Sequence, residues 1–131
     1  MLLATNAAAD PCLAVPDRGP TPVRFKTGRT ITGPVVYVGD GDGLCVALSS
    51  RREDWVEIRL ADFYAPELNE PGGEAAKAAL SRLVMGRRVD CVAGRRSYDR
   101  IVARCRLDGQ ALGELMARRV AQGGRGHPGR P

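Results

Sequence analysis

The sequence lacks a long hydrophobic run and is poor in histidine and aromatic residues. No apolar stretch among its 131 residues approaches the ~20 residues that a membrane-spanning helix needs, so we expect no membrane partner. Aromatic residues make up 5% of the chain, and the single histidine, His127, stands in a glycine-rich tail where we expect no chemistry. With 44% hydrophobic and 27% charged residues, the composition predicts one globular domain with a modest core.

Cysteines are present, but no C-x-x-C spacing joins them, which argues against a zinc site or a thioredoxin-type site. Their even number permits two disulfides, and four cysteines allow three pairings. Cys91 and Cys105 flank a predicted hairpin centred near Tyr98, which could set them side by side across two strands. Buried free thiols are the alternative. The four positions are Cys12, Cys45, Cys91 and Cys105.

The start of the sequence, Met1 to Asp10, is similar to the end of a secretory signal. Ala7–Ala9 matches a small-residue cleavage site, but the basic part and most of the apolar part of a signal are missing. Either Met1 is not the true start, or this stretch is a plain disordered end. An exported ancestor also fits the even number of cysteines, so we expect a periplasmic or secreted protein, with the cytoplasm as the alternative.

Positive charge is concentrated in two segments. The formal net charge is +5, and residues 118–131 hold four arginines and no acid, so the rest of the chain nets only +1. A basic tail is usually a solvated end. The segment 87–106 holds seven arginines against Asp90 and Asp99. This density suits contact with phosphate, and we expect nucleic acid as the partner, although a solvated hairpin can carry such charge too.

Hydrophobic periodicity predicts three strands, a helix, a two-stranded hairpin and a second helix. Val56, Ile58 and Leu60 alternate with polar residues, as in a half-buried strand, and Gly33-Pro34 indicates a bulge or an edge in the first strand. A meander followed by a helix and a closing hairpin is the plan of a five-stranded OB-fold barrel, mainly β with helices (α+β). The predicted strands are 30–38, 44–48, 55–60, 89–93 and 101–107, and the predicted helices are 74–85 and 111–120.

The chain divides into three predicted parts. Residues 1–22 form a leader, a possible signal-peptide remnant, and the four prolines between residues 10 and 22 predict an extended segment without regular structure. Residues 23–122 form the barrel domain. Residues 123–131 are predicted to be a flexible basic tail.

Three short stretches carry the candidate chemistry: Asp40–Gly43, Arg59–Glu67 and Tyr98–Arg100. Each is ordinary alone, but in this order and spacing they resemble the staphylococcal nuclease-like (thermonuclease) family over about residues 35–121. That family has an Asp-Gly-Asp-Thr turn, an Arg-Leu strand ending in Asp-x-Pro-Glu, an alanine-rich helix and a Tyr-Gly-Arg segment. The resemblance implies a five-stranded barrel and calcium-dependent endonuclease hydrolysis of DNA and RNA.

The resemblance also implies roles for three residues in hydrolysis. Glu67 matches the proposed general base, and Arg59 and Arg100 match the arginines that grip the scissile phosphate. Guanidinium groups can hold the negative charge that develops on phosphate oxygens, and a carboxylate within hydrogen-bond reach of water can take its proton. We therefore expect these three residues to converge on one pocket.

A calcium site is implied too, with one departure from the family. Asp42 matches a carboxylate ligand, Ala65 offers its backbone oxygen, and Asp40 lies nearby without binding the ion directly. Tyr64 stands where the family has its second carboxylate, and a neutral, bulky phenol cannot replace that ligand. Asp62 is a candidate substitute on the same strand face, about 6.6 Å away along the strand. Calcium is therefore a doubtful cofactor, and its affinity should be substantially reduced.

Three functions compete at this point. The first is a monomeric nuclease-like phosphodiesterase, weak or with altered metal dependence. The second is a non-catalytic OB-fold module in which Arg59, Arg100 and the neighbouring basic hairpin hold nucleic acid or phosphate without hydrolysis. The structural alternative to either site is a salt-bridge set with Glu67 between the two arginines, which would join strand, loop and hairpin. The third is an exported protein-interaction domain without nucleic acid, which the small charge outside the tail keeps open.

Overall fold

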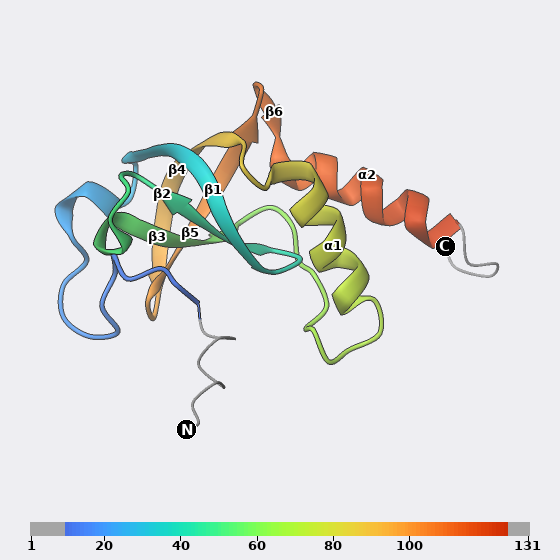
Figure 1. The fold of residues 1–131 in the computed structure, drawn as a ribbon, viewed down its shortest axis with the longest axis horizontal. Coiled ribbons are helices and arrows are strands. Elements are labelled where there is room, and N and C mark those ends of the chain that lie inside the picture. Colours follow the sequence, from blue (N-terminus) through green and yellow to red (C-terminus); the bar gives the residue numbers. More distant parts are fainter. Residues whose placement is uncertain (1–9, 126–131) are drawn as a thin grey trace.

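A closed β-barrel with two helices forms the protein (Figure 1). The computed structural model describes residues 10–125. Five strands follow each other around the barrel in the order β3-β2-β1-β4-β5, and a parallel pairing of β3 with β5 closes it. This confirms an α+β, OB-like barrel. The strands are β1 (Thr30–Asp40), β2 (Gly43–Ala47), β3 (Trp55–Leu60), β4 (Arg88–Ser97), β5 (Arg100–Leu107) and β6 (Gln110–Ala111), and the helices are α1 (Gly73–Val84) and α2 (Leu112–Arg125).

The long strand β1 pairs with two different strands along its length. Residues 30–34 pair with β4, and residues 35–40 pair with β2. The strand passes the end of β2 at Gly33, where a Cβ atom would lie 2.1 Å from the carbonyl oxygen of Ala47, so only glycine fits. The irregularity predicted at Gly33-Pro34 corresponds to this change of partner. The shifts in register between β1 and β2 lie further along, between Val35 and Tyr37 and between Val38 and Asp40.

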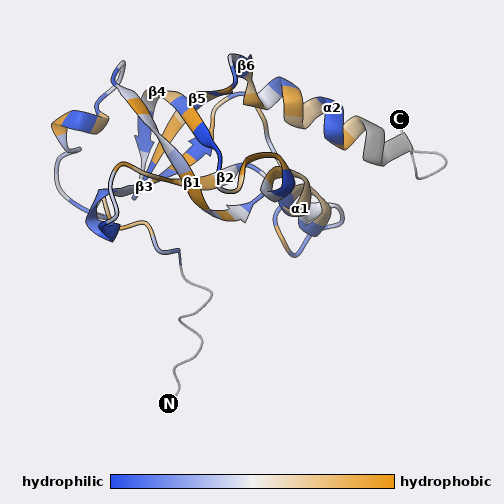
Figure 2. Ribbon diagram, turned by 45° about the horizontal axis from the view of Figure 1, so that its top comes forward, coloured by the Kyte–Doolittle hydropathy of each residue, from blue (hydrophilic) through white to orange (hydrophobic). Residues whose placement is uncertain are grey.

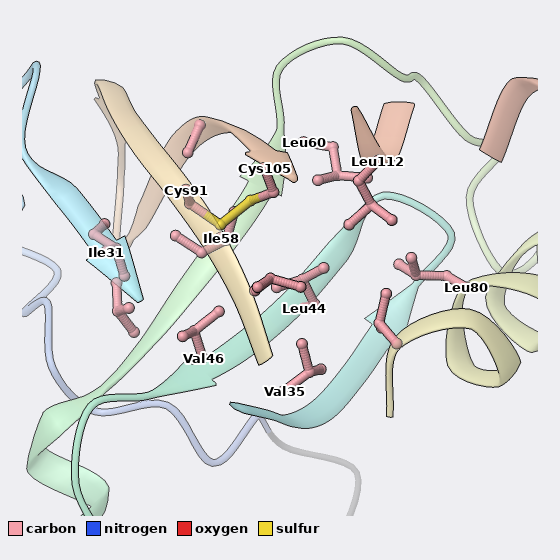
Figure 3. Close-up of a cluster of buried hydrophobic side chains, with 14 of the residues drawn as sticks. Ile31, Val35, Leu44, Val46, Ile58, Leu60, Leu80, Cys91, Cys105 and Leu112 are labelled. Atoms are coloured by element: carbon pink, nitrogen blue, oxygen red, sulfur yellow. A yellow bond between two sulfur atoms is a disulfide. The ribbon is translucent and has the colours of Figure 1, made fainter. Parts of the chain in front are cut away.

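The barrel interior and the inner faces of both helices share one hydrophobic core (Figure 3). In β3 the predicted alternation holds, with Val56, Ile58 and Leu60 buried. Leu80 of α1 and Leu112 of α2 are both fully buried against the barrel. Figure 2 shows hydrophobic and hydrophilic residues alternating along the strands and along α2, as expected of elements with one buried face.

Glycines set the ends of helix α1. Its alanine-rich sequence favours a helix, which follows Gly72 in the left-handed region at φ 87°. The helix stops before Gly86, which has φ 78°. These bounds agree with the predicted helix 74–85 to within one residue. The second helix is longer than predicted, because it continues past residue 120 to Arg125. No helix within residues 10–125 has both the length and the apolar character needed to cross a membrane.

The segment 10–22 belongs to the barrel and is not a separate leader. It contains no helix or strand, as predicted, but Val15 is buried in the core and the Ala14 N–H donates to the Trp55 carbonyl at 2.9 Å. The domain therefore begins before the predicted boundary at residue 23. The candidate cleavage site at residues 7–9 of the predicted signal remnant, and His127 with the end of the tail, lie outside the described residues.

Two disulfides hold the described part of the chain. Cys12 is bonded to Cys45 of β2, and Cys91 of β4 is bonded to Cys105, its direct partner on β5. The second bond lies among the core side chains in Figure 3. No cysteine is free, so these pairings replace the alternative of buried thiols. Disulfides of this kind fit an oxidising, extracellular or periplasmic environment.

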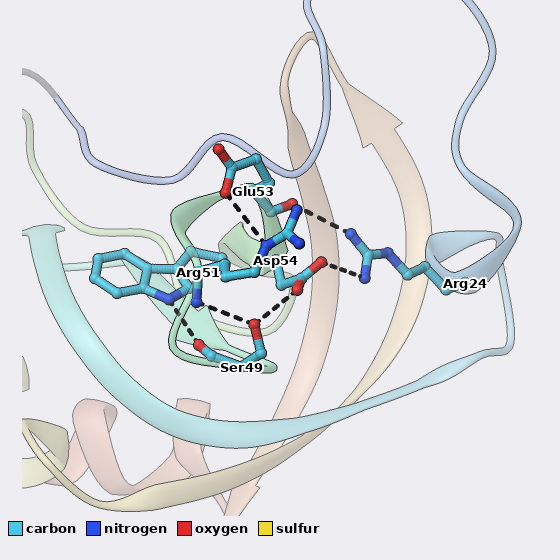
Figure 4. A network of polar contacts seen from close by, with 6 residues as sticks. Arg24, Ser49, Arg51, Glu53 and Asp54 are labelled. Atoms are coloured by element: carbon cyan, nitrogen blue, oxygen red, sulfur yellow. Dashed lines mark hydrogen bonds and ion pairs between the residues drawn. The ribbon is translucent and has the colours of Figure 1, made fainter.

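A polar network orders the turn between β2 and β3 (Figure 4). Arg24 donates to the Asp54 carboxylate at 2.8 Å, and the Ser49 hydroxyl donates to the same carboxylate at 2.7 Å. The Trp55 indole N–H donates to the Ser49 carbonyl at 2.9 Å. The network ties the segment before β1 to this turn and gives Trp55 a structural partner.

Removing either disulfide should lower stability, because each closes a loop in the unfolded chain. The bonded pairs are 33 and 14 residues apart, so the double replacements Cys12→Ala/Cys45→Ala and Cys91→Ala/Cys105→Ala should each cost about 3 to 4 kcal/mol. Urea unfolding measures the loss. Alkylation of these cysteines in denaturant without reductant would contradict the pairing.

Candidate functional site

The turn between β1 and β2 is fastened to the end of β3 through Asp42. The Asp42 carbonyl accepts the Leu60 N–H at 2.8 Å, and its carboxylate Oδ2 accepts the Ala65 N–H at 3.1 Å. The Asp42 N–H in turn donates to Asp40 Oδ1 at 3.3 Å. One residue thereby joins the turn, the end of a strand and the loop that follows it.

Packing requires glycine inside this turn. A Cβ atom at Gly41 would lie 2.5 Å from the Cβ of Ala76 on α1 and 2.7 Å from the Cβ of Ala65 in the loop. A Cβ atom at Gly43 would lie 2.8 Å from Asp40 Oδ1. The turn therefore packs closely against the loop and helix α1, and the glycines of the Asp-Gly-Asp-Gly sequence provide the space for this packing.

Asp42 is a buried carboxylic acid, with 6% of its surface exposed. Burial is the largest cause that raises its pKa, to about 6, and the neighbouring Asp40 adds to the rise. The hydrogen bond from Ala65 and the charge of Arg59 act in the opposite direction. The effect of Arg59 indicates that its guanidinium lies within electrostatic reach of Asp42.

Arg59 projects from the outer face of the barrel, on the side of β3 opposite to the buried residues. Its neighbours in the sheet are Gly43 on β2 and Val102 on β5, so no large polar side chain stands directly beside it. Its guanidinium carbon lies 6.0 Å from the centre of the Tyr64 ring, at the limit of a cation–π contact. Arg59 thus lies between the turn of Asp42 and the loop of Tyr64.

Arg100 shares the outer face with Arg59. It is the parallel-strand partner of Glu57, two residues before Arg59 on β3. Burial raises the pKa of Glu57, a hydrogen bond with Asp10 and the negative charges of Asp10 and Asp99 raise it further, and Arg100 opposes the rise. A raised pKa favours the neutral acid, which leaves the charge of Arg100 less compensated.

Glu67 lies two residues beyond Ala65, so their Cα atoms are at most about 7 Å apart. Its backbone is fixed, because its N–H donates to Glu70 Oε1 at 2.7 Å and its carbonyl lies against Gly73 at the start of α1. Its side chain is exposed. The ion pairs of the described chain join Arg24 to Asp54, Arg51 to Glu53 and Arg87 to Asp108. The salt-bridge set proposed for Glu67, Arg59 and Arg100 is therefore not formed.

The oxygen donors beside Asp42 do not fit a calcium ion, which prefers six to eight oxygens with several carboxylates. One Asp42 oxygen is already hydrogen-bonded to Ala65, and Tyr64 extends into solvent with 71% of its surface exposed. The Asp62 carboxylate does not replace the missing ligand, because it lies against Gly113 of helix α2. The contact is so close that a Cβ atom at Gly113 would lie 2.3 to 2.6 Å from the carboxyl atoms of Asp62. Asp62 thus packs on α2.

Another group of potential metal ligands in the described chain is also unsuited to binding a metal ion. Asp10, Cys12 and Cys45 lie close together, but both sulfurs are joined in a disulfide and only one carboxylate remains.

A cavity of about 420 Å³ opens beside Arg59 on the outer face. Its lining includes Tyr64 from the loop, Val102 from β5 and Arg95 from β4. Sequence reasoning placed Arg95 only within a basic segment and did not single it out. The sequence feature that could have identified Arg95 is Gly94. An isolated glycine in a strand indicates a bulge, and a bulge changes the direction in which the next side chain points.

The predicted site residues are thus brought together in part. Asp40, Asp42 and Ala65 form one hydrogen-bonded group, and Arg59 pairs in the sheet with Gly43 beside it. Arg100 lies on the neighbouring strand of the same face, and Glu67 extends from the attached loop. No hydrogen bond or ion pair between described residues links the Glu67 carboxylate to either arginine.

Asp42→Asn should change how stability depends on pH. The folded protein holds the Asp42 proton up to a pKa of about 6, whereas the reference value is 3.8, so the folded state binds more protons between these values. The unfolding free energy should therefore fall by up to about 3 kcal/mol as pH rises through this window. Asparagine can still accept the Ala65 N–H but cannot ionise, so the variant should lose this fall.

Urea unfolding of both proteins between about pH 4 and pH 7 measures the difference. Asp17→Asn, which changes an exposed acid, is the matched control. Equal pH slopes for wild type and Asp42→Asn would contradict a buried, destabilised carboxylate.

Comparisons with known proteins do not identify a family for this chain. No protein-family model matches it, and no curated protein matches it either. The resemblance to staphylococcal nuclease-like proteins therefore rests on its three motifs and their spacing. The function has to be argued from the outer face of β3 and β5 and the loop attached to it.

Proposed function

We propose that this protein is a nuclease-like phosphodiesterase that binds the backbone of DNA or RNA on the outer face of β3 and β5. The observation that carries the proposal is the 3.1 Å hydrogen bond from the Ala65 N–H to Asp42, because it holds the Glu67 loop against the turn beside Arg59. Arg100 supplies a second guanidinium on the neighbouring strand. Two such groups on one face suit contact with phosphate oxygens.

Hydrolysis would use side chains of this chain. Arg59 and Arg100 would hold the phosphate and neutralise the charge that builds on its oxygens. As a water oxygen bonds to phosphorus and the P–O ester bond breaks, the Glu67 carboxylate would accept the proton of that water, and the departing alkoxide would take a proton from solvent. Its exposure without an ion-pair partner supports this role. Because the donors do not suit calcium, we expect slow turnover.

The second candidate is a binding module without turnover, and Tyr64 favours it. A ring stands where the catalytic relatives implied by the resemblance have a carboxylate, and it lies beside Arg59. This exchange removes a negative charge from a face that would otherwise hold a cation. Binding of phosphodiester is common to both candidates, and only hydrolysis separates them.

The setting we infer is periplasmic or secreted, since two disulfides stabilise a small domain best outside a reducing cytosol. We further propose that the protein acts as a monomer.

Binding should depend on salt and on both arginines. For a labelled single strand, the double variant Arg59→Gln/Arg100→Gln should bind more weakly than wild type. Its slope of log affinity against log salt should fall by about 0.7 for each lost phosphate contact. Fluorescence anisotropy between about 50 and 200 mM salt measures both quantities. Arg82→Gln, an exposed arginine on α1, is the control and should keep the wild-type slope. A double variant with unchanged affinity would contradict the proposed face.

Glu67→Gln should abolish hydrolysis and leave strand binding intact, since the amide cannot accept the proton. Cleavage of denatured DNA at high protein concentration, with calcium, magnesium or manganese, is the assay. Glu74→Gln, an exposed acid at the start of α1, should cleave like wild type.

Absence of any cleavage by the wild type would reject the phosphodiesterase and leave the binding module. In that case Tyr64→Asp tests the missing ligand directly. Calcium-dependent cleavage appearing only in this variant would establish the natural protein as a binder.

A further inference from the structure

The cavity beside Arg59 contains a second cation, Arg95, and an aromatic ring, Tyr64, that the proposed chemistry leaves unused. Arg59 and Arg95 both line it, together with Tyr64 and Val102. Asp62 lines it as well, but its carboxylate packs against Gly113 of α2. None of the ion pairs of the described chain includes Arg59 or Arg95. The cavity therefore carries net positive charge, and its size of about 420 Å³ is within the range of small-ligand pockets.

A β-bulge brings Arg95 into this cavity. Ala93 pairs with Ala103 and Arg96 with Ile101, so β4 contains one residue more than β5 over this stretch. Before the bulge, Val89, Cys91 and Ala93 point inward, and strict alternation would place Arg95 inward too. The extra residue turns Arg95 outward, as bulges do when they redirect a side chain. Gly94 permits the bend, because a Cβ atom there would lie 2.8 Å from the Val102 carbonyl oxygen.

Tyr64 presents an aromatic surface at the same place. The side chain is 71% exposed, which is high for a residue of this size, and its ring lies 6.0 Å from the guanidinium carbon of Arg59. A ring held beside a guanidinium is the combination on which unpaired nucleic-acid bases stack, since every base offers a π face. Bases within a duplex already stack on each other and cannot reach such a ring without leaving the helix.

We propose that this cavity is a nucleotide subsite in which an unpaired base stacks on Tyr64 while the adjoining phosphate bridges Arg59 and Arg95. The inference rests on the proposed function to the extent that it needs nucleic acid on this face, but it holds for a binder and for an enzyme alike. Arg95 thereby gains a phosphate-binding role, and Tyr64 gains a stacking role in place of the lost ion ligand. The ligand that we expect in this subsite is single-stranded nucleic acid with intact bases.

An abasic strand separates stacking from charge, because it keeps the phosphates and lacks the bases. Anisotropy with a labelled single strand, its abasic counterpart and the matching duplex should give the tightest binding to the intact single strand. Tyr64→Leu should weaken binding of the intact strand by about tenfold and remove its advantage over the abasic strand. Tyr64→Phe keeps the ring and should bind like wild type.

Arg95→Gln should weaken binding of intact and abasic strands alike and lower the salt slope by about 0.7. Arg88→Gln, an exposed arginine of β4 that does not line the cavity, is its matched control and should keep the wild-type slope.

Equal affinity for intact and abasic strands, or wild-type binding by Tyr64→Leu, would overturn the subsite while salt-dependent binding through Arg59 and Arg100 still stood. Loss of all salt-dependent binding in the wild type would instead reject the proposed function, and the subsite with it.

Discussion

The hydrogen bonds of Asp42 are the constraint on which the rest of the site depends. Its carbonyl and carboxylate accept the N–H groups of Leu60 and Ala65, so these hydrogen bonds join the β1–β2 turn to the end of β3 and to the following loop. Burying this carboxylate is unfavourable, as its raised pKa indicates, and the fold tolerates it only because Ala65 satisfies one oxygen. This hydrogen bond, together with the packing of Ala65 against Gly41, holds the Glu67 loop beside the turn.

Local patterns predicted the barrel well, because its strands and first helix follow their own periodicity. The strand 55–60 matches the structure at both ends, since Val56, Ile58 and Leu60 all face one core. The docking of residues 10–22 was not predictable in the same way. It depends on the bond between Cys12 and Cys45, and four cysteines allow three pairings that local sequence does not distinguish.

Site residues within a compact motif could be predicted from the sequence. Those near a point where the inward–outward alternation of a strand ends or is reversed could not. Asp42 and Arg59 were expected together, and the sheet places them near each other, because Arg59 pairs with Gly43, the residue after Asp42. Asp62 was placed by strand alternation, but β3 ends at Leu60, so alternation no longer applies and the side chain packs on α2. Arg95 was missed for the related reason that the bulge at Gly94 reverses the alternation of β4.

Acidic side chains compensate the arginines of the outer face only in part. Asp42 partly compensates Arg59, and Glu57 with Asp99 partly compensates Arg100, but burial favours the neutral form of both Asp42 and Glu57. Arg95 has no acidic ion-pair partner in the described chain. A carboxylate at position 64 would offset one of these cations, whereas a phenol does not. In the proposed function, Tyr64 in place of a carboxylate leaves this face better suited to a phosphate than to a cation, and its exposed ring is available to stack on a base attached to that phosphate.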